Sequence, residues 1–377
     1  MKVSTLQEQL ARGLGIVSRA VDTRTTLPVL ANVLLSADDA QLKLTATNLQ
    51  MSVTSYIGAK VERPGAITLP AKTLAELVAN LAPERVDMTL DPATQSVNVR
   101  CGTTVSNIRG IAASEFPPIP EGGDPDVMLP ARTFREMIVQ TVFAAAKEDN
   151  RPILTGVYMQ FDGDVLTMAA ADGFRLAVRT ARIEQHFDPP RDLVVPARTL
   201  AEVARIIVDD EGEVGISLPG ERDLILFFIE NTVVTSQLLE GRFPDFSAII
   251  PKTYNTAITV YTSDLLRACK RAEIFARDNN FSTRFTARPP ANPGEPGTVL
   301  VTGRSNERGD NEGLIDASVE GESLEAAFNI RYMIDVLSVI HEESVIVESC
   351  GPASAGVIRP QGRDDFLHII MPMSLTR

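Results

Sequence analysis

Histidine and cysteine are the side chains in this sequence whose chemistry would suit a nucleophile, a general base or a metal ligand. The three histidines are far apart and have unlike neighbours: His186, His341 and His368. The three cysteines include no close pair: Cys101, Cys269 and Cys350. Such spacing supports neither a catalytic relay, nor a CxxC metal site, nor a disulfide framework. We therefore predict no enzymatic activity, no metal and no cofactor, and we expect the thiols to be buried.

Two local patterns resemble ligand-binding loops without meeting their requirements. Gly13, Leu14 and Gly15 match the start of a dinucleotide-binding loop, but they fall inside a helical pattern that no strand precedes. The acidic segment around Asp310 lacks the spacing of carboxylates that a calcium loop needs. We interpret the first pattern as part of a helix and the second as the tip of a solvated hairpin.

An internal repeat is the strongest sign of how the chain is organised. ITLPAKTLAELV at 67–78 and LVVPARTLAEVA at 193–204 are nearly the same segment. The segment that starts at Leu27 aligns with the one that starts at Arg151 at a similar offset. Repeats of this length indicate a duplicated building block.

A third, fainter copy begins at Phe328 with FNIRYMIDVL. It places Arg331 where the second copy has Arg198, and Asp335 where that copy has Glu202. Three repeats of roughly 125 residues each would be ordinary domains in size. We predict three similar domains at 1–124, 125–252 and 253–377, with boundaries in loops that contain Pro and Gly.

Hydrophobic periodicity predicts two amphipathic helices in each repeat. The predicted helices cover 5–24, 71–81, 131–151, 197–207, 263–278 and 329–339. Alternating segments such as AQLKLTAT and DVLTMAAA predict strands between them. This order predicts an α+β fold in which each domain gathers two helices on one face of an antiparallel sheet. The Pro-rich segment 287–297 predicts a long exposed hairpin loop, to which we assign no function.

Composition fits compact globular domains, with 44% hydrophobic and 23% charged residues. The longest uninterrupted apolar run, Leu224 to Ile229, is far too short for a membrane helix. The N-terminal segment has no apolar core of the kind found in secretory signals. We predict a cytoplasmic protein with no membrane partner.

Charge is distributed unevenly along the chain. The formal net charge is −13, yet the six predicted helices together contain more basic than acidic residues. Two explanations fit this distribution. Basic residues favour helices in general, or one helical face is turned toward a polyanion while an acidic exterior repels it elsewhere.

Four groups of segments, taken in their order along the chain, are together specific to one family. They are TLPVLANVLLSADDAQLKLTATNLQMSV, then AAADGFRLAV with LLEGRFPDFSAIIP, then FNIRYMIDVL, and finally HIIMPMSL. Over essentially its whole length the chain resembles the bacterial sliding clamps, the beta subunits of DNA polymerase III. The resemblance implies a head-to-tail homodimer of three-domain subunits, a ring whose inner helices surround duplex DNA while the sheets form the outer wall.

A ring that topology holds on DNA needs only a mild positive charge toward the duplex, which favours the second explanation of the charge distribution. The implied partners are duplex DNA without sequence preference and a second copy of the chain. The DNA polymerase III alpha subunit, the clamp loader and repair proteins are also implied, through short linear peptides. In this family such peptides enter an apolar pocket between the second and third domains.

Carried over residue by residue, the resemblance implies three sets of functional residues. The DNA-binding set is Arg24, Arg151, Arg198, Arg271 and Arg331. The peptide pocket is Leu154, Gly173, Phe174, Arg175, Leu176, Pro244, Ile249, Ile370, Met371, Pro372, Met373 and Leu375. The dimer interface is Ile274 and Phe275 against a strand around Ser106 and Ile108 of the other subunit.

Some of these positions depart from the pattern of the family. Ala171, Phe174, Ala248 and Ser374 stand where members often have Thr, His, Arg and a basic residue, respectively. Ser106 is smaller and more polar than the aromatic residue that is common there. We expect a less polar pocket with an altered peptide preference, and a dimer contact with a reduced apolar centre.

Two other classes of function are alternatives to a clamp. One is an enzyme with an interdomain active site, which would require a convergent acid, base and nucleophile that the sequence does not offer. The other is a structural homo-oligomer that never meets DNA. Retention on circular DNA, with release after the circle is cut, separates a clamp from both.

Overall fold

The computed structural model describes residues 1–374 except 23–25, 121–122, 149, 221–222 and 293. Arg24 and Leu375, two of the predicted site residues, therefore lie outside the described residues. The chain forms two compact units, which are treated separately below. The first unit contains Met1–Phe134 and Glu202–Leu238, and the second contains Arg135–Ala201 and Leu239–Arg377.

The first unit contains two antiparallel sheets. The smaller one has the order β5 (Lys60–Arg63), β1 (Lys2–Leu6), β7 (Arg85–Asp91), β8 (Ser96–Cys101) and β9 (Thr104–Arg109). The larger one has the order β10 (Ile111–Ala112), β6 (Gly65–Pro70), β2 (Asn32–Asp38), β3 (Gln41–Thr47), β4 (Met51–Gly58), β16 (Thr232–Gln237), β15 (Leu224–Ile229), β14 (Glu213–Ser217) and β11 (Val127–Pro130). Because β4 of the first repeat pairs with β16 of the second, part of the second repeat continues the sheet of the first.

The second unit is built on one ten-stranded sheet. Its order is β12 (Gly156–Ala171), β13 (Arg175–Pro196), β24 (Phe366–Ile370), β23 (Gly356–Pro360), β22 (Ser344–Ser349), β17 (Thr256–Tyr261), β20 (Gly309–Gly321), β19 (Gly297–Ser305), β18 (Ser282–Arg288) and β21 (Leu324–Asn329). The pairing of β13 with β24 joins the rest of the second repeat to the third. The Pro-rich segment connects β18 to β19, as predicted for a hairpin loop.

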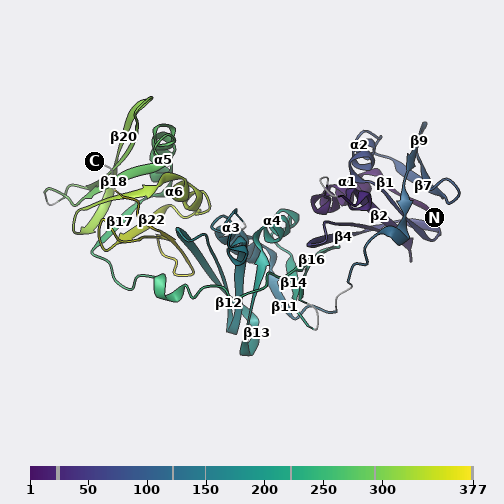
Figure 1. Ribbon diagram of the computed structural model, residues 1–377, viewed down its shortest axis with the longest axis horizontal. Helices are drawn as coiled ribbons and strands as arrows, with labels where there is room; N and C mark the ends of the chain where they lie inside the picture. Colours follow the sequence, from purple (N-terminus) through teal and green to yellow (C-terminus); the bar gives the residue numbers. More distant parts are fainter. Residues whose placement is uncertain (23–25, 121–122, 149, 221–222, 293, 375–377) are drawn as a thin grey trace. The chain divides into compact units, whose positions relative to one another are not determined.

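Six α-helices are formed by the described residues. They are α1 (Gln7–Val17), α2 (Ala71–Ala79), α3 (Ala131–Val142), α4 (Ala197–Ile206), α5 (Thr262–Ala276) and α6 (Ile330–Leu337). Five short 3₁₀ helices are η1 (Ser18–Ala20), η2 (Pro28–Ala31), η3 (Ala113–Glu115), η4 (Pro152–Thr155) and η5 (Ser247–Ile249). Within their units α1 contacts α2, and α5 contacts α6 (Figure 1). The mixed helix and antiparallel sheet architecture confirms the predicted α+β fold class.

Small residues set how closely α1 and α5 approach their sheets. A Cβ on Gly13 of α1 would lie 2.8 Å from a methyl group of Leu44 on β3, so the glycine permits close contact. In the second unit the glycine is on the strand instead. A Cβ on Gly303 of β19 would lie 2.4 Å from the carbonyl oxygen of Ala272 on α5. Gly13 thus has a packing role, in agreement with its interpretation as part of a helix.

Several predicted element bounds are confirmed and two are wrong. Helices α2 and α4 begin at Ala71 and Ala197, directly after a proline, as predicted. The helix predicted over 5–24 is shorter, because residues 5 and 6 belong to β1, which pairs with β5 and β7. The helix predicted over 131–151 ends at Val142, and the amide of Ala146 instead donates to the carbonyl of Leu154 at 2.8 Å. The division into domains 1–124, 125–252 and 253–377 rests on the repeat and stays a prediction.

Candidate functional site

A groove of about 520 Å³ opens on the second unit. It is lined by Phe174, Asn279, Asn280, Ser282, Asn329, Tyr332, Met371, Pro372, Met373 and Ser374. These residues come from the turn before β13, the segment from the end of α5 to the first residue of β18, the junction of β21 and α6, and the segment after β24. Phe174 is 64% exposed and Met371 is 43% exposed, so two large apolar side chains face solvent here. The groove can therefore bind an apolar group while the amides and hydroxyls around it offer hydrogen bonds.

The turn that carries Phe174 is fixed by Asp172. One carboxylate oxygen of Asp172 accepts from the amides of Phe174 at 2.9 Å and of Arg175 at 3.1 Å. Gly173 between them has φ +93°, a conformation that glycine adopts readily. The Phe174 carbonyl in turn accepts from the amide of Met371 at 2.8 Å. These contacts place Phe174, just before β13, and Met371, just after β24, side by side at the groove.

The C-terminal segment is anchored on its other side as well. The amide of Met373 donates to the carbonyl of Ala327 on β21 at 2.7 Å. The segment after β24 therefore spans from the start of β13 to β21 and forms one wall of the groove. Its two methionines, Met371 and Met373, are flexible apolar side chains that can adapt to different ligands.

A buried arginine connects this turn to α6 and to the residue that follows α3. Arg175, whose side chain is 4% exposed, donates to Asp172 at 3.0 Å, to Asp335 of α6 at 2.6 Å and to the carbonyl of Phe143 at 2.5 Å. Its guanidinium also lies 4.3 Å from the ring centroid of Tyr332. Burial raises the pKa of Tyr332, so its hydroxyl stays protonated and can donate a hydrogen bond at the groove. Arg175 thus supports the groove from beneath rather than lining it.

His368 lies in the same buried layer. Its ring is 5.2 Å from that of Phe143, and neither of its nitrogens has a hydrogen-bond partner among the described residues. Burial, followed by the charge of Arg175, lowers the pKa of His368 to about 3. The imidazole is therefore neutral at physiological pH and serves as a packing group. His186 and His341 are exposed and far along the chain from it.

The structure distributes the predicted pocket residues over two faces of the sheet. Phe174, Met371, Pro372 and Met373 line the groove, while Gly173 shapes the adjacent turn. Arg175 and Ile370 are paired across β13 and β24 and share the buried face beneath α6. Leu176 lies on the opposite face, because successive side chains of a strand alternate.

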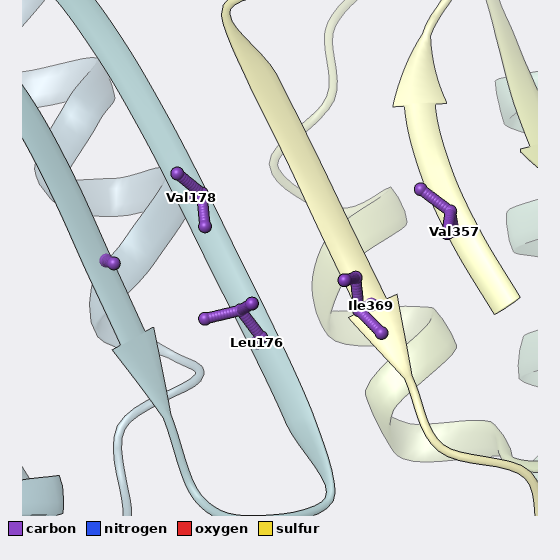
Figure 2. Close-up of a cluster of buried hydrophobic side chains, with 5 residues drawn as sticks. Leu176, Val178, Val357 and Ile369 are labelled. Carbon is purple, nitrogen blue, oxygen red and sulfur yellow. The ribbon is translucent and has the colours of Figure 1, made fainter. Parts of the chain in front are cut away.

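On that opposite face Leu176 belongs to a buried apolar cluster. Its members are Ala169, Leu176, Val178, Val357 and Ile369, which lie on β12, β13, β23 and β24 (Figure 2). Ile369, which the prediction omitted, is the β24 residue paired with Leu176. A second cluster contains Leu154, Val194 and Phe243. Tyr158, Ala171 and Phe246 pack against both clusters, so they form one continuous apolar region.

Pro244 and Ile249 are exposed, and they flank Phe246 of this region in the sequence. Five groove residues were not predicted: Asn279, Asn280, Ser282, Asn329 and Tyr332. Ser374, named above only as a departure from the family pattern, also lines the groove. Asn329 and Tyr332 lie within the FNIRYMIDVL segment that the resemblance included, but the repeat alone could not show which of its residues face a groove. The Asn279–Asn280 pair carried only the signal of a helix end.

The arginines predicted to face DNA differ in their surroundings. Arg151, Arg198 and Arg271 are exposed and form no ion pair with another described residue. Arg331 is engaged instead, since it pairs with Glu273 at 3.5 Å and covers the ring of Phe281 at 3.6 Å. With their observed bounds, α3, α4 and α5 each contain one more basic than acidic residue, and α1, α2 and α6 are balanced. The mild positive charge of the helices therefore lies on α3, α4 and α5.

The residues predicted for the dimer interface lie beside strand edges. Ser106 and Ile108 are on β9, the edge strand of the five-stranded sheet, where Ser106 is half-buried and Ile108 is buried. Ile274 and Phe275 are near the end of α5, and Ile274 is 49% exposed. Helix α5 packs on β19 and β20.

Neither a metal centre nor a membrane helix is found in the part of the chain that the structure describes. No group of three or more potential His, Cys, Asp or Glu ligands occurs among these residues. None of the described helices combines the length and apolar character required to cross a bilayer.

Comparison with known proteins gives one consistent result. Family models of the DNA polymerase III beta subunit match three consecutive stretches: its N-terminal domain at 1–120, its central domain at 128–245 and its C-terminal domain at 247–374. The beta sliding clamp of Synechococcus elongatus is 32% identical over 381 residues, which cover 100% of each chain. That of Bacillus subtilis is 29% identical and covers 99% of each chain.

Solved structures agree with the sequence matches. The crystal structure of the DNA polymerase sliding clamp from Bacillus subtilis superimposes with a TM-score of 0.93 at 29% identity, over 100% of both chains. A sliding clamp from Pseudomonas aeruginosa bound to griselimycin superimposes with a TM-score of 0.91 at 28% identity, again over 100% of both chains.

Proposed function

The chain belongs to the family of DNA polymerase III beta subunits, the bacterial beta sliding clamps, and from that premise we propose that two copies close into a ring around duplex DNA. It is a DNA clamp and a non-catalytic processivity factor. The observation that carries the proposal is the match of all three domain models, in order, along one chain. A place in the bacterial cytoplasm, where replication occurs, is part of the proposal.

Two open strand edges support closure of the ring. Strand β9 pairs only with β8 among the described strands. Strand β20 pairs with β19 along 309–317 but with β17 only along 318–321, which leaves the other side of 309–317 without a described strand partner. An unpaired edge is a template for another strand. We propose that β9 of one copy pairs with β20 of the other, so that two head-to-tail contacts close the dimer.

Exposed apolar side chains accompany both edges. Val105 on β9 is 50% exposed, Leu314 on β20 is 66% exposed, and Ile274 on α5 is 49% exposed. Burying them would favour association, since each large apolar side chain removed from water contributes roughly 1.5–3 kcal/mol when fully buried. The proposed interface therefore includes Ser106, Ile108, Ile274 and Phe275, as the resemblance implied.

We also propose that the helices face the DNA, through weak contacts. A net acidic chain with formal charge −13 is unsuited to tight binding, which depends on many phosphate contacts. The guanidinium groups of Arg151, Arg198 and Arg271, which form no ion pair with another described residue, can attract the phosphates without fixing one position. Arg24 belongs to the same proposal, although it lies outside the described residues.

The groove on the second unit and the adjacent apolar region are proposed to receive short linear peptides. The partners would be the DNA polymerase III alpha subunit, the clamp loader and repair proteins. Phe174, Met371 and Met373 provide adaptable apolar contacts for anchor residues of such peptides. The partly buried Tyr158, Ala171 and Phe246, which pack on the Leu154 and Leu176 clusters, extend this surface. The exposed Pro244 and Ile249 belong to it as well, and Leu375 is included on the resemblance alone.

Retention on closed DNA tests the clamp directly. A clamp loader would place the labelled protein on a nicked circular plasmid, and gel filtration would separate bound from free protein. We expect retention on the circle and release once a restriction enzyme cuts it, because topology rather than affinity holds the ring. Equal loss from circular and linear DNA would refute the ring.

A variant at the proposed interface makes the assay specific. Ile274→Asp should give a monomer at low micromolar concentration and abolish retention. Val208→Asp is the matched control, since Val208 is 75% exposed and lies outside the proposed interface. A parent protein that stays monomeric even at high concentration would contradict the dimer.

A further inference from the structure

The segment between α5 and β18 adopts a conformation that its side chains disfavour. Asn280 has φ +48° and Phe281 has φ +59°, and a bulky residue such as Phe rarely occupies this left-handed region. Asn279, Asn280 and Ser282 of the same segment line the groove. Backbone of this kind persists only where its surroundings hold it, and it is concentrated at functional sites.

Backbone hydrogen bonds fix part of this segment. The amides of Asn279 and Phe281 donate to the carbonyl of Ala276 at 3.0 and 2.9 Å, and the amide of Ser282 donates to Asn279 at 2.8 Å. The Phe281 carbonyl accepts from the amide of Ile330 at 2.8 Å, which ties the segment to the start of α6. These bonds leave the Phe281 ring to be held by side-chain contacts.

Arg331 provides that contact. Its guanidinium carbon lies 3.6 Å from the centroid of the Phe281 ring, and its Nε lies 3.5 Å from a carboxylate oxygen of Glu273 on α5. The Arg331 amide donates to the Asn329 side chain at 3.0 Å. One residue thus connects α6, α5 and the left-handed segment, and its neighbours Asn329 and Tyr332 both line the groove.

We propose that Arg331 is a positioning residue for the peptide groove, and not a DNA contact as the resemblance implied. The inference rests on the proposed peptide-binding function of the groove. By covering Phe281 and pairing with Glu273, Arg331 holds the wall formed by residues 279–282 in place before a peptide arrives. A preformed wall lowers the ordering that binding requires.

A DNA contact and a positioning residue should respond differently when Arg331 is replaced by lysine. Attraction to DNA phosphates needs a positive charge, which lysine retains. Covering an aromatic ring while pairing with a carboxylate uses the planar guanidinium, which lysine lacks. Arg331→Lys therefore keeps the charge that DNA attraction needs but removes the guanidinium that positions the wall. Arg331→Gln removes both. Arg198, which occupies the equivalent repeat position and forms no described ion pair, is the matched control.

The first measurement is peptide affinity. Overlapping peptides that cover the polymerase alpha subunit are screened against the parent protein, and the tightest one is titrated by calorimetry against each variant. We expect Arg331→Lys and Arg331→Gln to weaken binding by roughly two- to fivefold, the loss expected for an exposed cation–π contact. Arg198→Lys and Arg198→Gln should bind like the parent. In a Phe281→Leu background, Arg331→Gln should have no further effect, because the two residues act through each other.

The second measurement needs no peptide. Hydrogen exchange at the amides of Phe281 and Ser282 should be faster in Arg331→Lys than in the parent, with the unfolding midpoint unchanged. If no peptide binds the parent, the proposed function of the groove fails, whereas the exchange result still reports on Arg331. The inference is overturned if Arg331→Lys has the peptide affinity and the hydrogen-exchange rates of the parent. It is also overturned if Arg331→Gln alone differs from the parent and the difference is a loss of retention on circular DNA.

Discussion

In the first unit, every buried side chain that bears oxygen or nitrogen among the described residues carries a hydroxyl or an amide, whereas the second unit also buries Arg175, Arg179 and His368. The side-chain amide of Gln7 is neutral and donates one hydrogen bond, 2.7 Å to the carbonyl of Val78. A buried guanidinium needs several acceptors from different elements. The unit with the groove therefore uses buried charge to fix the arrangement of its helices.

The same contrast appears at equivalent positions of the repeat. In α2, Lys72 and Glu76 lie 3.9 Å apart and are 84% and 67% exposed. In α6 the equivalent residues are Arg331 and Asp335, and each pairs with a residue outside the helix: Glu273 on α5 and Arg175 on β13. One sequence pattern thus gives a solvated pair in one repeat and two structural contacts in another.

Removing Arg175 should have the largest effect on stability. Arg175→Met leaves the Phe143 carbonyl and the Asp335 carboxylate without their donor, and loss of one partner of a buried pair costs about 3 kcal/mol. Such losses of unfolding free energy usually lie at about 3–5 kcal/mol. We expect the lower value because the Asp335 side chain is 42% exposed and can be hydrated instead. Chemical denaturation followed by circular dichroism measures the change.

Arg12→Met is the matched control from the first unit. Arg12 pairs with Glu230 at 3.1 Å, but both side chains are largely exposed, so the change should be within about 0.5 kcal/mol. A loss below about 1 kcal/mol for Arg175→Met would mean that buried charge does not distinguish the two units.

Acid should affect the second unit through His368. Folding lowers the pKa of His368 from its ordinary value of 6.5 to about 3, so protons bind the unfolded chain preferentially in this window. The contribution of neutral His368 to the free energy of unfolding is fully present above pH 6.5 and is lost as the pH falls toward 3. Between pH 7 and pH 5 the loss should be about 2 kcal/mol.

His368→Leu isolates this contribution, since leucine fills a buried site without titrating. The difference in unfolding free energy between parent and variant should change with pH by that amount, while carboxylates contribute equally to both proteins. A difference that stays constant from pH 7 to pH 5 would show that His368 is accessible to protons in the folded chain.

Truncation at the groove should affect binding more than stability. Met373→Ala removes an apolar wall residue and should weaken peptide binding by at least roughly 1 kcal/mol, as for an anchor-lining residue. Calorimetric titration with the tightest peptide of the alpha subunit measures it. Val208→Ala is the matched control, because Val208 is an apolar residue that is 75% exposed and does not line the groove. Equal affinity of Met373→Ala and the parent would remove Met373 from the site.

The fold was largely accessible from the sequence because its signals are local. A proline before each second helix marked the starts of α2 and α4, and alternation marked the strands. The ends of the first helices were not marked. Ala144, Ala145 and Ala146 are good helix formers. The end of the helix shows only in the backbone hydrogen bonds, such as the one from the Ala146 amide to the carbonyl of Leu154, eight positions along the chain.

The site was accessible only in part, because neighbouring residues of a strand face opposite ways. Phe174, Arg175 and Leu176 are consecutive, yet they line the groove, fill the layer beneath α6 and enter the cluster of Figure 2, respectively. The resemblance supplied the segment but not the side-chain directions. It likewise assigned Arg331 by its charge, whereas its Phe281 and Glu273 contacts depend on α5 and the following turn.

The Lys72–Glu76 pair should give the smallest effect and is the strictest test of the comparison. Lys72→Ala should change the unfolding free energy by no more than about 0.5 kcal/mol, because an exposed pair four residues apart on a helix is screened by water and salt. Alanine also has the higher helix propensity, which offsets part of the lost attraction. Chemical denaturation at low and high salt separates the two contributions, because salt weakens the charge attraction but not the helix propensity. A loss of about 2 kcal/mol that persists in high salt would mean that an ion pair stabilises α2 as it does α6, since only buried pairs escape screening. The first and third repeats would then not differ in how they use this pair of positions.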